Sequence, residues 1–263
     1  MNMIFGRYVS GDSFIHKLDP RDKLISATLI IIISFLANEP LSALILGLIC
    51  LLILLVSKIK LLFFFRGIRF FLIMIAFTAI LQLLFANNGE ELFSVGPIRI
   101  TSFGAKIASL TFFRFSLAII IATLFTLTTS MIQISDAVGY LIRPLKIFKL
   151  PVDDIVLTLS IALRFIPTML QEISTISDAQ KARGSSLNSR SIAKKIKAIV
   201  PILMPLFIAS VRRAEDLATA MIMRGYSDGK NRTKFRIMKW KNRDTLIILF
   251  LLFLLIFFGI TKK

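Results

Sequence analysis

The sequence predicts an all-α membrane protein with about five transmembrane helices and a cytoplasmic domain of about three amphipathic helices. Of the 263 residues, 56% are hydrophobic and 24 are phenylalanine, more than the core of a soluble domain of this length requires. The mean hydropathy is +0.80. The apolar residues are gathered into long runs, whereas 20 of the 33 lysines and arginines fall between residues 132 and 244.

Five apolar runs are candidates for membrane-spanning helices, and they cover residues 24–37, 41–56, 70–86, 107–131 and 245–260. The first two are shorter than the roughly 20 residues that a helix needs to cross a bilayer. We therefore expect them to borrow length from flanking residues, with Lys23 and Lys58 snorkelling to the interface. Asn38, Glu39 and Pro40 predict a tight turn between these two runs, because proline favours a helix start and the polar pair belongs in water.

The distribution of lysine and arginine orients these spans. Four basic residues precede the first span and four lie between residues 58 and 69, whereas the connection at 87–101 contains only Arg99 beside two glutamates. Because basic segments stay in the cytoplasm, we expect a cytoplasmic N-terminus, an external 87–101 connection and an external C-terminus. Alternating residues around Gly96 and Pro97 predict a small hairpin in that connection.

The same charge distribution bears on domains and partners. A formal net charge of +18 would ordinarily suggest nucleic acid as a partner, but in a membrane protein excess basic charge first marks the cytoplasmic segments. We therefore expect no nucleic-acid partner. The predicted division of the chain is an N-terminal segment with four spans (1–131), a cytoplasmic domain (132–244), and a last span with the C-terminus (245–263).

The segment 132–244 is too polar to span a membrane but is patterned as helices. A shorter helix is expected over 135–148, with N-cap oxygens from Ser135 and Asp136 and a kink or restart at Pro144. Next, apolar residues recur at alternating steps of four and three, which places a stripe on one helix face. This stripe consists of Ile155, Leu159, Ala162, Ile166, Met169, Ile173 and Ile176.

A third helical stretch begins at about residue 192 and continues to Arg224, with an interruption expected at Pro201 and Pro205. Both long helices end with the pattern Ala-x-x-x-Arg-Gly, and the two arginines are 41 positions apart. Glycine there permits the left-handed conformation that ends a helix, and arginine suits the negative end of the helix dipole, so capping alone explains either motif. The repetition favours a second role, in which Arg183 and Arg224 project past the helix ends and bind a partner through several donors.

Four motifs together resemble a known family. They are Leu18-Asp19-Pro20-Arg21, Arg164-Phe165-Ile166-Pro167, Ala182-Arg183-Gly184 and Met223-Arg224-Gly225. With them, nearly the whole chain resembles the transmembrane T component of energy-coupling factor transporters, an ABC-type class that imports vitamins and metal ions. The chain departs from the family pattern at Met223, where alanine is usual, so the packing beside Arg224 is expected to differ.

The resemblance implies a subunit with five spans and three coupling helices that transmits ATP-driven motion from two cytoplasmic ATPases to a separate substrate-binding membrane subunit, the S component. It implies that the C-terminal ends of the two long cytoplasmic helices dock into the ATPases, through Ala179, Ala182, Arg183, Gly184, Ala220, Arg224 and Gly225. The stripe is the candidate surface for helix packing or for the S component. ATP and magnesium would be bound by the partner ATPases, and this chain would bind no cofactor or metal. It would lie in the lipid bilayer of a prokaryotic plasma membrane.

Other functions are less well supported by the residues. A membrane-embedded enzyme would need clustered carboxylates or histidines, but His16 is the only histidine and Asp153-Asp154 suits a helix N-terminus. The residues 225–231 fail as a phosphate loop in spacing and in lacking Ser or Thr after the lysine. A self-contained carrier or channel, or a membrane-embedded scaffold, stays as the alternative, although the spans offer few polar groups beyond Gln82 and Arg114. We expect Arg114 to face other helices or to reach the outer surface.

Overall fold

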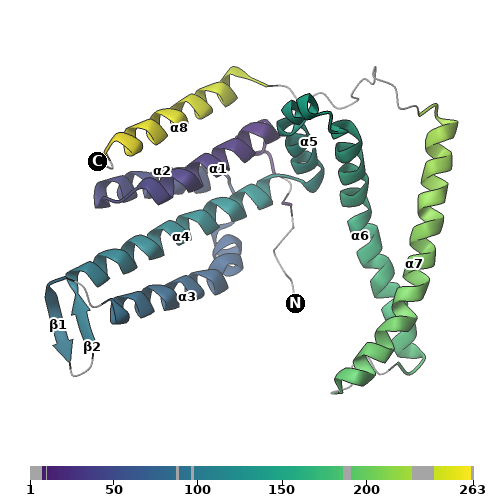
Figure 1. The fold of residues 1–263 in the computed structure, drawn as a ribbon, viewed down its shortest axis with the longest axis horizontal. Helices are drawn as coiled ribbons and strands as arrows, with labels where there is room; N and C mark the ends of the chain where they lie inside the picture. Colours follow the sequence, from purple (N-terminus) through teal and green to yellow (C-terminus); the bar gives the residue numbers. More distant parts are fainter. Residues whose placement is uncertain are drawn as a thin grey trace. The chain divides into compact units, whose positions relative to one another are not determined.

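The structure, a computed structural model, describes residues 8–9, 11–86, 89–95, 98–185, 191–226 and 240–261. It consists of α-helices and one short hairpin, as expected for an all-α membrane protein (Figure 1). The chain forms two compact units, of which one contains Met1–Val156 with Met238–Lys263 and the other contains Leu157–Ile237. This division describes packing, and the topological division at residues 131 and 244 stays a prediction.

The first unit is a helical bundle. Its long helices are α1 (Pro20–Leu36), α2 (Pro40–Val56), α3 (Leu61–Phe85), α4 (Ser102–Thr128) and α8 (Asn242–Thr261). Each contains most of one predicted apolar run. By length and composition, α3, α4 and α8 are able to cross a membrane, and the described part of α2 is a shorter apolar helix. Because α1 also has only 17 residues, the count of five spans stays a prediction for these two helices.

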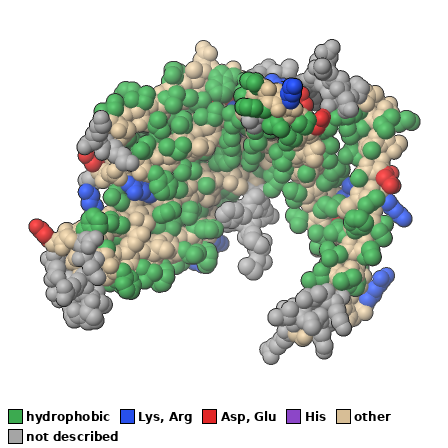
Figure 2. Space-filling model, in the orientation of Figure 1, with side chains coloured by type: hydrophobic (Ala, Val, Ile, Leu, Met, Phe, Trp, Pro, Cys, Tyr) green, Lys and Arg blue, Asp and Glu red, His purple; other side chains and the backbone are tan. Residues whose placement is uncertain are grey.

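The bundle core lies where α1, α2, α3, α4 and α8 meet. Its largest fully buried side chains are Phe64, Ile33, Leu46, Ile68 and Leu127, each less than 2% exposed. Many other large apolar side chains remain exposed on the same helices, and they cover much of the visible surface in Figure 2. An exposed apolar surface of this extent fits lipid as the solvent.

The predicted hairpin is present between α3 and α4. Strands β1 (Glu91–Val95) and β2 (Ile98–Thr101) pair antiparallel. Thr101 then joins the two helices, because its hydroxyl donates to the carbonyl of Ala86 and accepts the N–H of Gly104 at the start of α4.

Arg114 of α4 has an anchoring role in this bundle. Its Nη2 donates to the carbonyl oxygen of Ala37, the C-cap of α1, at 3.1 Å, and also to the Oδ1 of Asn38 in the following turn. The guanidinium thus satisfies a carbonyl at the negative end of a helix and fixes the turn between α1 and α2. The expected contact of Arg114 with another helix is confirmed, whereas its reach toward the outer surface stays a prediction.

A buried polar cluster closes the opposite end of the bundle. Asp22 and Lys23 of α1 are 0% and 6% exposed, and Asp244 of α8 is 2% exposed. The Nζ of Lys23 donates to the carbonyl oxygens of His16 and Thr128, both at 3.1 Å. Lys23 therefore does not snorkel to the interface as predicted, because backbone carbonyls at the end of α4 provide acceptors inside the protein.

The Asp-Pro-Arg motif before the first span explains how α1 begins. Asp19 is the N-cap and its Oδ1 accepts the N–H of Arg21, while Pro20 occupies the first turn, where its missing N–H costs nothing. Arg21 lies over the ring of Tyr140, 3.6 Å from its centroid. This cation–π contact attaches α5 (Met131–Leu141) to the start of α1.

The start of α5 corrects the predicted N-cap. The helix begins after Ser130, whose hydroxyl accepts the N–H of Gln133 while the Gln133 side chain accepts the N–H of Ser130. This capping box precedes Ser135 and Asp136, so these two lie inside the helix. The predicted restart at Pro144 is confirmed, since a 3-10 helix, η1 (Arg143–Phe148), follows α5.

The second unit contains most of α6 (Val152–Ala182) and α7 (Ile192–Met223). The prediction that Pro201 and Pro205 interrupt α7 is wrong, because the helix is continuous through both. The two prolines are one turn apart, so the missing backbone hydrogen bonds lie on one side of the helix and the other side keeps its bonds. In the same way, α6 continues through Pro167.

Candidate partner-binding site on two crossing helices

The two Arg-Gly motifs adopt the same backbone structure at the ends of α6 and α7. At the end of α6, the N–H groups of Gly184 and Ser185 donate to the carbonyls of Lys181 and Gln180. At the end of α7, Gly225 and Tyr226 donate in the same pattern to Ile222 and Met221. This pair of bonds defines a Schellman motif, in which the arginine is the C-cap residue and the glycine is left-handed.

Glycine is required at both positions by its backbone conformation. Gly184 has a φ of +83° and Gly225 a φ of +73°, and a Cβ added at either would meet nothing within 4 Å. The requirement is therefore conformational and does not come from crowding. The space beside each glycine is open, so a partner's backbone could approach it closely.

The arginines at these ends are available to a partner. Arg183 and Arg224 are exposed, and among the described residues no ion pair is formed by either guanidinium. The alanines of the motifs at 179, 182 and 220 are exposed as well, and Met223 is 83% exposed. The side chain that departs from the resemblance thus lies beside Arg224 on the surface rather than in a core.

The two helices contact each other through a small polar crossing. Arg213 of α7 pairs with Glu172 of α6, with 3.0 Å between Nη2 and Oε2, and its guanidinium lies 5.7 Å from the ring centroid of Phe165. The hydroxyl of Ser210 is 3.6 Å from the sulfur of Met169. Phe165, Met169 and Glu172 thus form the α6 side of the crossing.

The crossing joins equivalent positions of the two helices. Glu172 lies 11 residues before Arg183, and Arg213 lies 11 residues before Arg224. The 41-residue offset that relates the two arginines therefore also relates the two residues of the ion pair. Met169 and Ser210, 14 residues before the respective arginines, keep the same offset.

Because of this equivalence, the segments that lead from the ion pair to the two arginines have the same length and point in opposite directions. We call these segments, 172–183 of α6 and 213–224 of α7, the two arms. The helices run antiparallel past the crossing, and Figure 1 shows their C-terminal ends at opposite extremes of the pair. At 1.5 Å per helical residue, each arm extends ~17 to 21 Å from the crossing to its arginine. The two Arg-Gly ends are thus separated by roughly 35 to 40 Å along the antiparallel pair.

The predicted stripe on α6 is only partly covered. Met169 lies at the crossing, whereas Ile155, Ile166 and Ile173 are 45%, 40% and 38% exposed. An apolar face on α7 is also exposed in the described structure, and it includes Leu203, Met204, Phe207, Ile208 and Val211. Both helices therefore present apolar surface beyond their own contact.

Glu172 and Arg213 are site residues that sequence reasoning missed. Taken singly, each is an ordinary charged residue on an amphipathic helix. The available signal was the 41-residue offset, which places them at equivalent positions of a repeat already visible in the motifs. Opposite charges at these equivalent positions form the ion pair where the two helices meet.

The weaker candidate residues have local structural roles. The two ring nitrogens of His16 are bound, with Nδ1 2.6 Å from the Ser13 hydroxyl and Nε2 3.0 Å from the Val9 carbonyl oxygen. Asp153, in the first turn of α6, pairs with Lys146 of η1. Most of the 225–231 segment considered as a phosphate loop lies outside the described residues.

Comparison with known proteins places this geometry in context. Residues 11–235 match the family model CbiQ, described as cobalt transport protein. A protein of Streptococcus equi subsp. equi is 46% identical over 261 residues, covering 99% of this chain and 97% of the relative. A Lactococcus lactis subsp. cremoris protein is 44% identical, covering 100% and 98%, and a Bacillus subtilis protein is 40% identical, covering 98% of each. All three relatives are named energy-coupling factor transporter transmembrane protein EcfT.

Proposed function

Because the chain belongs to the CbiQ family, among the EcfT transmembrane proteins of energy-coupling factor transporters, we propose that it couples two ATPases to an S component. In this proposal the S component binds a vitamin or another micronutrient in the membrane. The ATPases bind ATP and magnesium, and this chain performs no catalysis. The observation that carries the proposal is the pair of identical Arg-Gly helix ends on arms of equal length.

Two equivalent ends suit two similar partner subunits. A pair of ATPase subunits related by a two-fold axis presents the same groove twice, at positions related by that axis. The antiparallel pair of α6 and α7 supplies two Arg-Gly ends with the same backbone structure, which point in opposite directions in a single chain. Each ATPase then receives one arginine, and a change in the distance between the grooves moves one arm against the other.

The chemistry of each end favours a charged groove. A guanidinium at a C-cap has up to five N–H donors beyond the last helical turn, and it binds carboxylates or carbonyl oxygens with two bonds at once. The open space at Gly184 and Gly225 allows the partner's backbone to come close to this turn. The small exposed side chains at positions 179, 182 and 220 keep the approach unobstructed.

The exposed stripe of α6 is proposed as a surface for the S component or for further helix packing. A charge at Ile166 or Ile173 then disrupts assembly, because the ammonium of a lysine would be desolvated in an apolar contact. Normal assembly and transport in both Ile166→Lys and Ile173→Lys would instead place this face against lipid headgroups.

The proposal needs residues 132–244 on the cytoplasmic side, since ATP-dependent partners work there. The 20 basic residues in this segment favour that orientation, with a cytoplasmic N-terminus and an external C-terminus in the plasma membrane of a prokaryote. A self-contained carrier or channel, or a membrane scaffold, is the alternative. Copurification of two ATPase polypeptides with the chain distinguishes the two functions.

The arginines provide the direct test. Arg183→Ala or Arg224→Ala should leave the protein inserted but weaken ATPase attachment, by about 2 to 5 kcal/mol if the contact is desolvated, and the double variant should be far worse. Arg212→Ala, at an exposed arginine of α7 away from the cap, is the matched control. Unchanged copurification and uptake in the double variant would remove these residues from the mechanism.

A further inference from the structure

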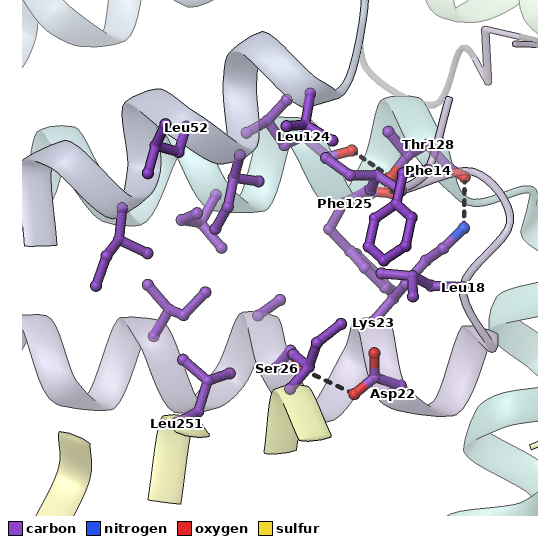
Figure 3. A pocket seen from close by; sticks show the side chains of 18 of the residues that line it. Phe14, Leu18, Asp22, Lys23, Ser26, Leu52, Leu124, Phe125, Thr128 and Leu251 are labelled. Atoms are coloured by element: carbon purple, nitrogen blue, oxygen red, sulfur yellow. Dashed lines mark hydrogen bonds between the residues drawn. The ribbon is translucent and has the colours of Figure 1, made fainter. Parts of the chain in front are cut away.

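The first unit contains a cavity that the coupling function does not use. It has a volume of about 460 Å³, which is in the range of small-molecule sites, and it lies between α1, α2, α4 and α8. Its walls are almost entirely apolar. Figure 3 shows Leu52, Leu124 and Leu251 from three of these helices around the open space.

The cavity is confined to one half of the bundle. It is lined by the beginning of α1, the ends of α2 and α4, and the beginning of α8. All four of these helix ends lie on the side where the polar cluster of Asp22 and Lys23 closes the bundle. The cavity therefore runs from that interface toward the middle of the bundle, which is the depth that one leaflet of a bilayer occupies.

The wall at the interface end is polar and carries unused hydrogen-bonding capacity. Asp22, Lys23, Ser26 and Thr128 line it, and Figure 3 shows them together at one end of the cavity. Lys23 donates to two carbonyls and so keeps one N–H, while among the described residues the Oδ2 of Asp22 has no hydrogen-bond partner. An apolar chamber with a polar end matches an amphipathic ligand.

The guanidinium of Arg243 lies beside the exposed rim of the cavity. Phe14 lines the cavity and is 43% exposed, and the guanidinium of Arg243 lies 5.9 Å from its ring centroid. Arg243 is itself exposed, so its charge is available to an anionic group at the membrane surface. A phosphate bound there would lie at the same end as the polar wall.

We propose that this cavity binds one acyl chain of a membrane phospholipid, whose phosphate lies at the mouth near Arg243. The chain fills the apolar space between α1, α2, α4 and α8, and the headgroup stays at the interface. The lipid thereby packs between four helices of the bundle. The site depends on membrane insertion alone, so it can be tested separately from ATPase coupling.

The test narrows the cavity at its exposed rim. Leu52, which lines the cavity from α2, is 60% exposed, so Leu52→Trp adds bulk without disturbing the core. Leu51→Trp, at a neighbouring residue that is 51% exposed and does not line the cavity, is the matched control. Native mass spectrometry of the full-length chain, purified in a mild detergent, counts the phospholipids that each variant retains.

We expect the wild type and Leu51→Trp to retain phospholipid and Leu52→Trp to retain roughly tenfold less, the loss expected when about two methylenes are excluded. Arg243→Gln should lower retention roughly fivefold, and Arg66→Gln, at an exposed arginine of α3, should not. Equal retention in the two tryptophan variants overturns the site, and equal retention in the two glutamine variants overturns the phosphate contact. Crosslinking of Leu52→Cys to a partner subunit in the assembled transporter, with no lipid retained, would make the cavity a protein interface and also overturn the proposal.

Discussion

Removing Arg213 should loosen the crossing of α6 and α7 more than removing its partner Glu172. The side chains of the pair are 29% and 23% exposed, so their charge-assisted hydrogen bond is partly screened and contributes about 1 to 2 kcal/mol. Arg213 also lies over Phe165, a cation–π contact worth about 0.5 to 1 kcal/mol. Glu172→Gln therefore loses only the ion pair, whereas Arg213→Gln loses both contacts and should cost roughly 1.5 to 3 kcal/mol.

The expected consequence is a wider range of angles between the arms. Spin labels attached to Ser185→Cys and Tyr226→Cys, in a variant that lacks Cys50, the only cysteine of the sequence, report the separation of the two helix ends. Pulsed electron–electron double resonance should give a distance of ~35 to 40 Å in the otherwise unchanged chain. This value follows from the length of the two arms at 1.5 Å per helical residue. The distribution should broaden slightly in Glu172→Gln and clearly in Arg213→Gln. Uptake should fall in the same order while the ATPases stay attached, because Arg183 and Arg224 are intact.

Two controls make this result interpretable. Lys181→Gln breaks the exposed pair with Asp178, whose side chains are 50% and 66% exposed, and should change neither distance nor uptake. The exchanged pair, Glu172→Arg with Arg213→Glu, should recover part of the loss. If Arg213→Gln has the distance distribution and uptake of the wild type, or if the exchanged pair is no better than the single variants, the crossing is not held by these contacts.

Two further predictions concern other parts of the chain. Gly184→Ala and Gly225→Ala should each strain a left-handed helix end by about 1 to 2 kcal/mol. Titration of each variant with the ATPases should therefore show weaker binding, while membrane insertion of the chain is unchanged. In a variant lacking Cys50, Ser94→Cys should react with a membrane-impermeant thiol reagent on intact cells, and Ser185→Cys should not. The reverse pattern would place the coupling helices outside the cell and would refute the ATPase proposal.

Most of the helices could be predicted from the sequence because helix formation depends on near neighbours. The apolar runs predicted each long helix of the bundle to within five residues except at the start of α3, which begins at Leu61 rather than at residue 70, and the Gly-Pro turn predicted the hairpin. The two Arg-Gly patterns predicted helix ends, and both are Schellman motifs. The prediction errors concern helix boundaries where two local sequence patterns favour different structures. The capping box at Ser130 begins α5 before Ser135, and α7 continues through two prolines because one side of it keeps its hydrogen bonds.

The sequence by itself therefore determined the class of protein, its helices and the candidate arginines, whereas only the tertiary structure decided how distant residues meet. Lys23 and Thr128 are 105 positions apart, and no local pattern indicates that a lysine predicted to snorkel finds backbone acceptors at the end of α4. The pairing of Glu172 with Arg213, the position of Arg114 at the end of α1 and the cavity beside Leu52 depend in the same way on which helix faces pack together. Periodicity and capping act over a single helical turn, but a contact between helices depends on packing, burial and charge over the whole chain.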